Sequence, residues 1–201
     1  MPADSTRGTS ADGTRGTSAD GAEPDPNLFD DSVRLRWPDA RDLDAIDAGI
    51  HDPDVIRWIG PPEGTAEEVL ALNRSRAAAG SPTFAICQAD GACVGLVWVN
   101  RGTKDPTVGY VGYWILPDVR GRGLATRAVR LISGWALREL GCQSLGLTTD
   151  DANVRSQAVA ERSGFRCSKA AAGPLVARVG ASRNILYTLD PDAASPATTG
   201  D

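Results

Sequence analysis

The chain has 201 residues, 41% of them apolar, and a formal net charge of −5 at pH 7, which together predict one folded domain with some unstructured margin. No stretch approaches the roughly 20 uninterrupted apolar residues of a membrane span, and the N-terminus lacks the charged-then-apolar order of a signal peptide, so we expect a cytoplasmic protein without a membrane partner. Four widely spaced cysteines and one histidine, His51, argue against a disulfide framework, a zinc site and a Ser-His-Asp or Cys-His triad; we therefore expect no metal.

Both ends of the chain predict disordered tails. Residues 6–13 and 14–21 each read TRGTSADG, with no aromatic or branched aliphatic side chain to bury. Residues 1–31 carry seven acids and two arginines, which leaves 19 acids and 19 bases in the rest of the chain. A neutral body argues against nucleic-acid binding, which rests on a basic face. We predict an acidic tail over 1–31, a single domain over 32–190 and a second tail over 191–201.

Between the tails, apolar residues recur alternately with period 2 and period 3.6, which predicts a mixed α/β domain. The dipeptide Asp90-Gly91 predicts a hairpin with a type I′ turn. Gly141 and Gly164 predict helix ends. The predicted strands span 33–37, 83–88, 93–100, 108–116, 144–149, 165–167 and 184–189, and the predicted helices span 41–50, 66–79, 124–140 and 153–163.

One strand runs into the glycine-bearing turn Arg120–Ala125, which opens a helix. The first N–H groups of a helix lack intrahelical partners and carry about half a positive charge, so such a turn can bind phosphate. Glycines at 121 and 123 let phosphate oxygens approach those groups, and four arginines lie within eleven residues: Arg120, Arg122, Arg127 and Arg130. The turn lacks the lysine of a P-loop and the sequence context of a Rossmann fingerprint. A purely structural turn between strand and helix remains an alternative.

A wider window holds three motifs in order. They are Gly112-Tyr113-Trp114-Ile115-Leu116-Pro117, then Arg120-Gly121-Arg122-Gly123-Leu124-Ala125-Thr126, then Asn153-x-x-Ser156-x-x-Val159-x-Glu161-Arg162-x-Gly164-Phe165. Together they resemble the GNAT superfamily of acyl-CoA-dependent acetyltransferases, most closely its ribosomal-protein (RimJ/RimL-like) branch, over about residues 33–190. The resemblance implies an α/β GNAT fold: a mixed, mostly antiparallel central sheet with a V-shaped splay after the third-to-fourth strand, and helices on both faces.

The resemblance also implies that acetyl-CoA, as co-substrate, lies in that splay. Backbone groups around Ile115 and Leu116 would pair with the pantetheine arm, and Asn153 would hydrogen-bond it. The signature would hold the pyrophosphate through Arg120, Gly121, Arg122, Gly123, Leu124, Ala125 and Thr126. A neutral amine would attack the thioester directly, without a covalent enzyme intermediate.

Two residues are candidates for catalysis. Ser156 occupies the position from which this branch is thought to protonate the leaving thiolate, although a helix-surface hydroxyl is the alternative. Tyr110 stands where related enzymes often have a glutamate base, and tyrosine, with a reference pKa near 10, is a poor base at neutral pH. A water relay, Asp150 or Asp151 are the other options for the base.

The missing glutamate bears on the acceptor. A lysine amine with a pKa near 10.4 is almost wholly protonated at pH 7, whereas an α-amine near 7.7 to 8.0 is already partly neutral. We therefore expect a protein or peptide N-terminal α-amine, with an antibiotic-type small-molecule amine or a catalytically silent acyl-CoA-binding module as alternatives. A monomer and a homodimer are both open. An acidic set with one aromatic residue either attracts a cationic amine or is a solvated helix face: Asp52, Asp54, Trp58, Glu63, Glu67 and Glu68.

Overall fold

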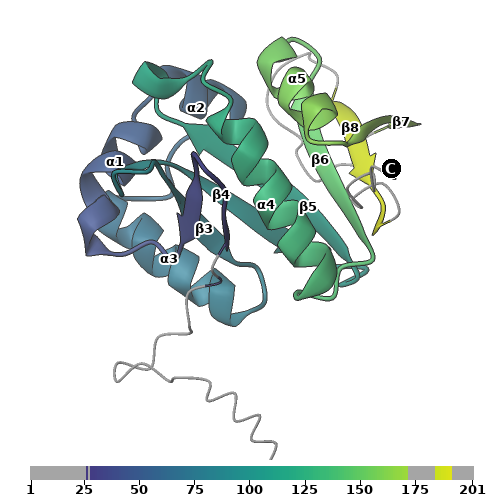
Figure 1. The fold of residues 1–201 in the computed structure, drawn as a ribbon, viewed down its shortest axis with the longest axis horizontal. Coiled ribbons are helices and arrows are strands. Elements are labelled where there is room, and N and C mark those ends of the chain that lie inside the picture. Colours follow the sequence, from purple (N-terminus) through teal and green to yellow (C-terminus); the bar gives the residue numbers. More distant parts are fainter. Residues whose placement is uncertain (1–25, 27, 172–183, 192–201) are drawn as a thin grey trace, which may run out of the picture.

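The computed structural model describes residue 26 and residues 28–171 and 184–191. Within them, one sheet has the strand order β1-β2-β3-β4-β5-β6-β8-β7 (Figure 1). Its strands are β1 Leu28–Phe29, β2 Arg34–Arg36, β3 Thr83–Cys87, β4 Cys93–Arg101, β5 Val108–Ile115, β6 Ser144–Asp150, β7 Arg166–Ala171 and β8 Asn184–Leu189. The helices are α1 Leu43–Ile50, α2 Pro53–Trp58, α3 Ala66–Ala78, α4 Leu124–Arg138 and α5 Val154–Arg162, with short 3-10 turns at Ala40–Asp42 and Pro117–Val119.

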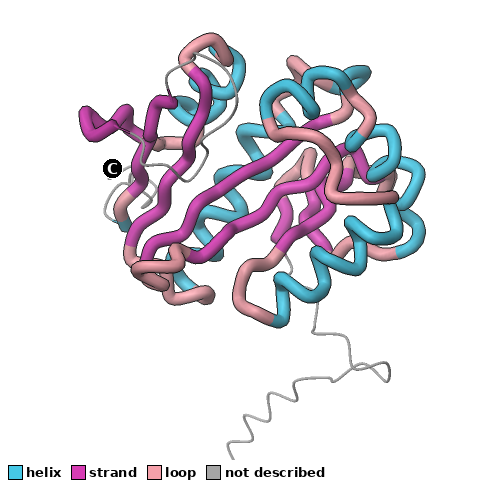
Figure 2. Tube along the Cα trace, turned by 180° about the vertical axis from the view of Figure 1, so that it is seen from behind, coloured by secondary structure: helices cyan, strands magenta, loops and turns pink. Residues whose placement is uncertain are grey.

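The sheet is covered on both faces (Figures 1 and 2). Helix α4 packs on one face, where Val97 and Ile115 meet Ile132 in the larger of two apolar cores. Helices α1 and α3 cover the other face, where Ile46 and Trp114 belong to the second core. This two-sided packing explains why β3 is buried along its whole length.

The sheet divides at β5 and β6, the one parallel pair among the described strands. Their pairing runs from Val108 opposite Ser144 to Tyr110 opposite Gly146 and then ends. Beyond that point β5 continues against β4 and β6 continues against β8. Figure 1 shows the consequence: β6, β8 and α5 diverge from the half of the sheet that carries α4. The predicted mostly antiparallel α/β fold and its splay are confirmed.

Local signals explain most element boundaries. Thr65 caps α3 by accepting from the Glu68 N–H, while the Glu68 carboxylate accepts from the Thr65 N–H at 2.8 Å. Gly91 adopts φ 85°, but its N–H donates to the Gln88 carbonyl, so the central turn residues are 89 and 90. The predicted type I′ turn at Asp90-Gly91 is therefore wrong, because the loop has three residues and ends on the left-handed glycine.

The predicted boundary at residue 31 also needs correction. Leu28 is buried in the larger core and pairs with Leu35, so β1 belongs to the domain. Residues 1–25, 27 and 192–201, which carry the predicted tails, lie outside the described residues. Within the described ranges, every helix is too short or too polar to traverse a lipid bilayer.

Candidate active site

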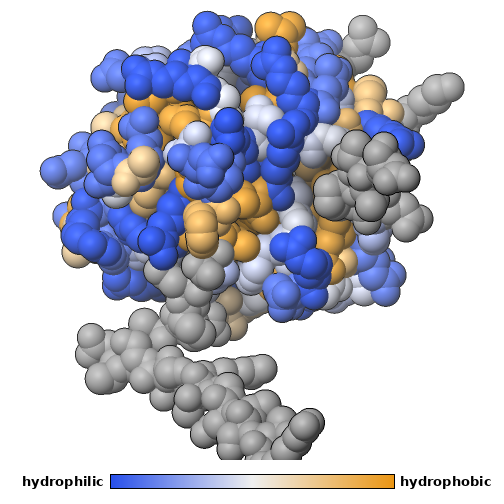
Figure 3. Space-filling view, in the orientation of Figure 1, coloured by the Kyte–Doolittle hydropathy of each residue, from blue (hydrophilic) through white to orange (hydrophobic). Residues whose placement is uncertain are grey.

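A cleft of about 1320 Å³ lies where β5 and β6 diverge. Helix α2, the first turn of α4 and one side of α5 complete its walls. Figure 3, in the orientation of Figure 1, shows hydrophilic side chains bordering apolar surface on the face that carries α4. The cleft is long enough to touch both faces of the sheet, since it reaches Trp58 and Trp98 as well as Ala125 and Val159.

Main-chain groups of β5 alternate between its two neighbours. The Gly102 N–H donates to the Val108 carbonyl at 2.8 Å, and the Leu116 N–H donates to the Val94 carbonyl at 2.9 Å. These bonds, at either end of a continuous register, place the even-numbered residues of β5 in the ladder with β4. The odd-numbered residues therefore direct their N–H and C=O groups toward β6.

This alternation leaves main-chain groups facing the cleft. Pairing with β6 stops at Tyr110, so both main-chain groups of Tyr113 and the N–H of Ile115 point into the splay. The Ile115 carbonyl accepts from Arg120 Nε at 2.8 Å. Leu116, for which the same role was predicted, uses its N–H in the bond to β4. An extended ligand with amide groups can therefore pair with Tyr113 and Ile115.

The glycine turn presents the start of α4 to solvent. Gly121 and Gly123 both have φ 79°, and a Cβ at either position meets no atom within 4 Å. Gly123 is the N-cap, without a side-chain cap bond, and the first helical bond runs from the Arg127 N–H to the Gly123 carbonyl at 3.1 Å. The N–H groups of the residues between, Leu124, Ala125 and Thr126, are the unpaired first-turn donors of a helix. Because Leu124 is buried in the core, its contribution to a ligand is its amide.

Two arginines of the signature, predicted to bind the pyrophosphate, donate to protein groups in this structure. Arg120 donates to the carboxylates of Asp54 at 2.8 Å and Asp52 at 2.7 Å, which ties the turn to the start of α2. Burial raises the pKa of Asp52, but hydrogen bonds from Arg120 and the Val55 N–H outweigh it and leave the pKa lowered. Arg122 is exposed and donates to the Asp118 carbonyl at 3.1 Å. Both side chains serve the turn's shape in this structure.

Ser156 lies on the α4 side of the cleft, in the first turns of α5. Asn153 caps this helix: its carboxamide oxygen accepts from the Ser156 N–H at 3.1 Å, so its NH₂ group is the part that can donate to a ligand. The hydroxyl of Tyr113 faces Ser156. Burial raises the pKa of Tyr113, and a hydrogen bond with the Ser156 side chain partly offsets this, so the phenol is neutral at physiological pH.

Sequence reasoning selected Tyr110 as a candidate and did not consider Tyr113, and both residues line the cleft. The signal was the period of two: Tyr113 shares the parity of Val111 and Ile115, which pack on the α4 side. Tyr110 has the parity of Trp114 and lies on the opposite face, where a Cβ on Gly146 would come 2.9 Å from its ring. Tyr110 therefore lines the cleft from the α1 side.

The α1 side of the cleft is lined by aromatic rings. A Cβ on Gly112 would come 2.4 Å from the ring of Trp98, so this ring lies directly against the glycine. Trp98 packs against the second core and also lines the cleft together with Trp58 and Tyr110. The even face of β5 thus supplies an aromatic floor.

Every carboxylate that lines the described cleft has a partner. Asp54 pairs with Arg120, Glu63 pairs with Arg76 at 2.8 Å, and Asp150 accepts from the Ala152 N–H at 2.8 Å. Asp151, Glu67 and Glu68 are not among the lining residues. Of the acidic set predicted to attract a cation, Asp52 and Asp54 therefore share Arg120 and Glu63 pairs with Arg76, whereas Glu67 and Glu68 lie outside the cleft lining.

The described cysteines and His51 are not among the residues that line the cleft. Burial raises the pKa of Cys87 and Cys142 and raises that of Cys93 to about 12, so none of these thiols is ionised at neutral pH. Cys167, by contrast, is exposed. His51 ends α1, where its Nδ1 lies 2.9 Å from the Asp47 carbonyl oxygen.

A splayed sheet beside a helix whose first N–H groups are unpaired is a feature by which a class of protein can be recognised. Comparison with known proteins shows which class this is. Residues 32–166 match the family described as "Acetyltransferase (GNAT) domain", and the chain belongs to this family. The resemblance predicted from its motifs is confirmed.

Among curated proteins, the chain is 30% identical to YdaF of Bacillus subtilis (strain 168), named as a candidate ribosomal N-acetyltransferase, over 38% of this chain and 42% of that protein. It is also 30% identical to an aminoglycoside N(6′)-acetyltransferase type 1 of Salmonella typhimurium, over 40% of this chain and 59% of that protein. The matches thus span roughly half the length of these relatives. Among solved structures, the Mycobacterium smegmatis RimJ complex with CoA-disulfide has a TM-score of 0.67 at 23% identity, covering 81% of this chain and 86% of that one.

Proposed function

We propose that this protein is an acetyl-CoA-dependent N-acetyltransferase that acts on a primary amine, preferably an N-terminal α-amine of a protein or peptide. The observation that carries the proposal is the cleft itself, in which unpaired main-chain groups of β5 continue into the uncapped first turn of α4. The match to the GNAT family and the CoA-bound relative support acetyl-CoA as the donor.

The donor follows the α4 side of the cleft. The amides of Gly121 to Thr126 bind the pyrophosphate, and the main-chain groups of Tyr113 and Ile115, with the NH₂ of Asn153, bind the pantetheine amides. This arrangement brings the thioester sulfur toward Ser156. Ser156, hydrogen-bonded to the neutral phenol of Tyr113, donates to the sulfur as it leaves.

The acceptor enters from the α1 side, over the aromatic floor. The amine nitrogen attacks the thioester carbonyl, a C–N bond forms, the C–S bond breaks, and the thiolate takes a proton through Ser156. The amine must arrive neutral or lose its proton to water or to Asp150, because the other cleft-lining carboxylates, Asp54 and Glu63, are held in ion pairs with arginine. An α-amine, with a pKa near 8, meets that condition far better than a lysine near 10.4.

The paired charges also favour a peptide over a polycationic acceptor. Polycations bind surfaces with excess negative charge. Here Asp54 and Glu63 are each matched by an arginine, so the α1 side offers aromatic surface and little net charge. A peptide end, with one amine, main-chain amides and a side chain, suits such a surface.

A thiol-release assay with acetyl-CoA tests the proposal. The panel contains peptides with a free α-amine, the same peptides with that amine blocked and one lysine added, an aminoglycoside and a polyamine. We expect turnover on the free α-amines and at least tenfold less on the other amines. Turnover on the aminoglycoside alone would show that the acceptor is a small-molecule amine. CoA binding without turnover on any amine would show that the protein is a catalytically silent acyl-CoA-binding module. A cytoplasmic location and a monomeric or homodimeric state stay predictions.

A further inference from the structure

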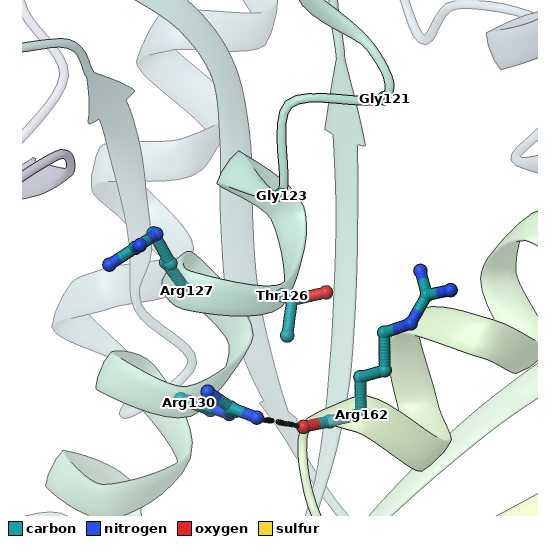
Figure 4. A pocket seen from close by; sticks show the side chains of 6 residues that line it. All are labelled: Gly121, Gly123, Thr126, Arg127, Arg130 and Arg162. Carbon is teal, nitrogen blue, oxygen red and sulfur yellow. Dashed lines mark hydrogen bonds between the residues drawn. The ribbon is translucent and has the colours of Figure 1, made fainter.

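A second pocket, of about 350 Å³, lies beside the glycine turn, where α4 meets the end of α5 (Figure 4). Its lining contains three arginines and no carboxylate: Gly121, Gly123, Thr126, Arg127, Arg130 and Arg162. A concave site with one sign of charge concentrates ions of the opposite sign. The three guanidinium groups differ, however, in their hydrogen-bond partners within the protein.

Arg127 is committed to the N-terminal segment. Its NH1 donates to the Asp30 carboxylate at 2.9 Å, and in Figure 4 its side chain points away from Arg162. Burial raises the pKa of Asp30, but hydrogen bonds from the Ser32 N–H, Arg127 and the Val33 N–H outweigh it, so the pKa is lowered and the carboxylate stays ionised. Arg127 is therefore the arginine least available to a ligand.

Arg130 is committed to the main chain of α5. It donates to the Arg162 carbonyl through Nε at 3.1 Å and through NH2. A cation at the C-terminus of a helix is favourable, because the last carbonyls lack partners. Arg130 thus fixes the end of α5 and, with it, the base of the Arg162 side chain.

Arg162 itself has a guanidinium without a partner among the described residues. Figure 4 shows its side chain reaching from α5 toward Gly121 and Thr126. A guanidinium presents a fork of N–H donors that matches two phosphate oxygens, and near two other arginines it gains most from an anion of charge −2. A phosphate monoester has that charge and geometry, whereas the pyrophosphate is already matched to the α4 amides.

We propose that Arg162, positioned by Arg130, binds a phosphate monoester of the acyl carrier that is separate from the pyrophosphate. In CoA this group is the 3′-phosphate. The inference rests on the proposed acyl-CoA function and adds a specificity to it: the protein selects CoA over 3′-dephospho-CoA, and Arg162 is the residue that selects.

Calorimetric titration of the full chain with CoA and with 3′-dephospho-CoA tests this inference. The parent is expected to bind CoA about tenfold more tightly, as for one charge-assisted bidentate contact. Arg162→Ala should lower the affinity for CoA about tenfold and leave that for 3′-dephospho-CoA unchanged, so that the preference disappears. The matched control is Arg166→Ala, an exposed arginine just beyond α5 that lines neither pocket; it removes the same charge and should keep the preference.

Unchanged binding of 3′-dephospho-CoA by Arg162→Ala also shows that the variant is folded. A parent protein without a preference, or an Arg162→Ala variant that weakens both ligands alike, overturns the inference while the acyl-CoA function stands. A parent that binds neither ligand overturns the proposed function instead.

Discussion

On the α4 side of β5, the cleft offers main-chain N–H groups, a neutral serine-tyrosine pair and, beside the turn, an arginine with no partner among the described residues. On the α1 side, the charged groups are already paired with one another and the remaining surface is aromatic. The first side suits a ligand rich in phosphate and amide groups. The second suits a ligand that brings few charges of its own, and a single strand separates the two.

The largest effect is expected from Ser156, the group that we propose as the donor to the leaving sulfur. Ser156→Ala should lower kcat about a hundredfold on a verified acceptor with little change in acetyl-CoA affinity, because the hydrogen bond to the thiolate forms in the transition state. Tyr113→Phe should lower kcat about tenfold, since Ser156 loses its partner. Steady-state kinetics with calorimetry separates the two quantities. A fully active Ser156→Ala variant would show that the hydroxyl of Ser156 does not protonate the thiolate, and Tyr110 would be the next residue to test.

Arg120 joins the two sides, and its loss is expected to be a matter of stability. Arg120→Ala leaves the largely buried Asp52 carboxylate without its ion pair and should lower the free energy of unfolding by about 1–3 kcal/mol at pH 7. Because the pKa of Asp52 is lowered in the folded state, this contribution is complete above the unfolded value of about 3.9 and is lost as the pH falls through the folded value. Thermal melts should therefore show the difference between the two proteins shrinking as the pH falls below about 3.9. A constant difference from pH 7 to pH 3 would contradict the assignment.

The glycine turn allows a matched pair of substitutions. Gly123 has a positive φ, which Asn and Asp tolerate better than other residues, so Gly123→Asn and Gly123→Asp impose similar strain and differ in charge. The aspartate places a carboxylate in front of the α4 amides and should weaken acetyl-CoA binding roughly tenfold more than the asparagine does. Equal affinities of the two variants for acetyl-CoA, measured by calorimetry, would show that the pyrophosphate does not bind at this turn.

A smaller gain is expected from releasing Arg127. Asp30→Asn keeps an oxygen for the Ser32 and Val33 N–H groups and removes the negative charge that Arg127 binds. CoA affinity should rise about two- to threefold at low salt, and the gain should shrink as salt screens it. A loss of affinity would mean that Asp30 orders the pocket.

No measurable effect is expected from removing residues 1–26. Their composition predicts no core contact, so the melting temperature should stay within about 1 °C. Deletion of residues 1–31 is the control, since it removes the buried Leu28 and the Asp30–Arg127 ion pair and should cost several degrees. Equal melting temperatures for the two deletions would show that β1 adds nothing to the fold.

The sequence predicted what depends on near neighbours in the chain. Gly164 was identified as a helix end and the turn at Gly121 and Gly123 as a helix start, because capping and turn chemistry act over three or four residues. Strand β8 was predicted with its observed ends, Asn184–Leu189. These signals require no knowledge of the rest of the fold.

What was missed depends on distant partners. The ion pairs of Arg120, predicted as a cofactor contact, could not be foreseen because the carboxylates that bind it lie more than sixty residues earlier in the chain. The two-residue strand β1 has no pattern of its own and exists through its pairing with β2. The choice of Tyr110 over Tyr113 was different, since the alternation of β5 already assigned them to opposite faces.

That alternation has a consequence for how such proteins diversify. In the proposed arrangement, even and odd residues of β5 face different reactants, so substitutions on the Tyr110, Gly112 and Trp114 side would change the acceptor while the Tyr113 and Ile115 side keeps its shape. Related proteins could then acquire new acceptor specificities through substitutions on one face of β5 while donor binding is retained. Relatives named for ribosomal and for aminoglycoside substrates, at the same 30% identity to this chain, fit that independence.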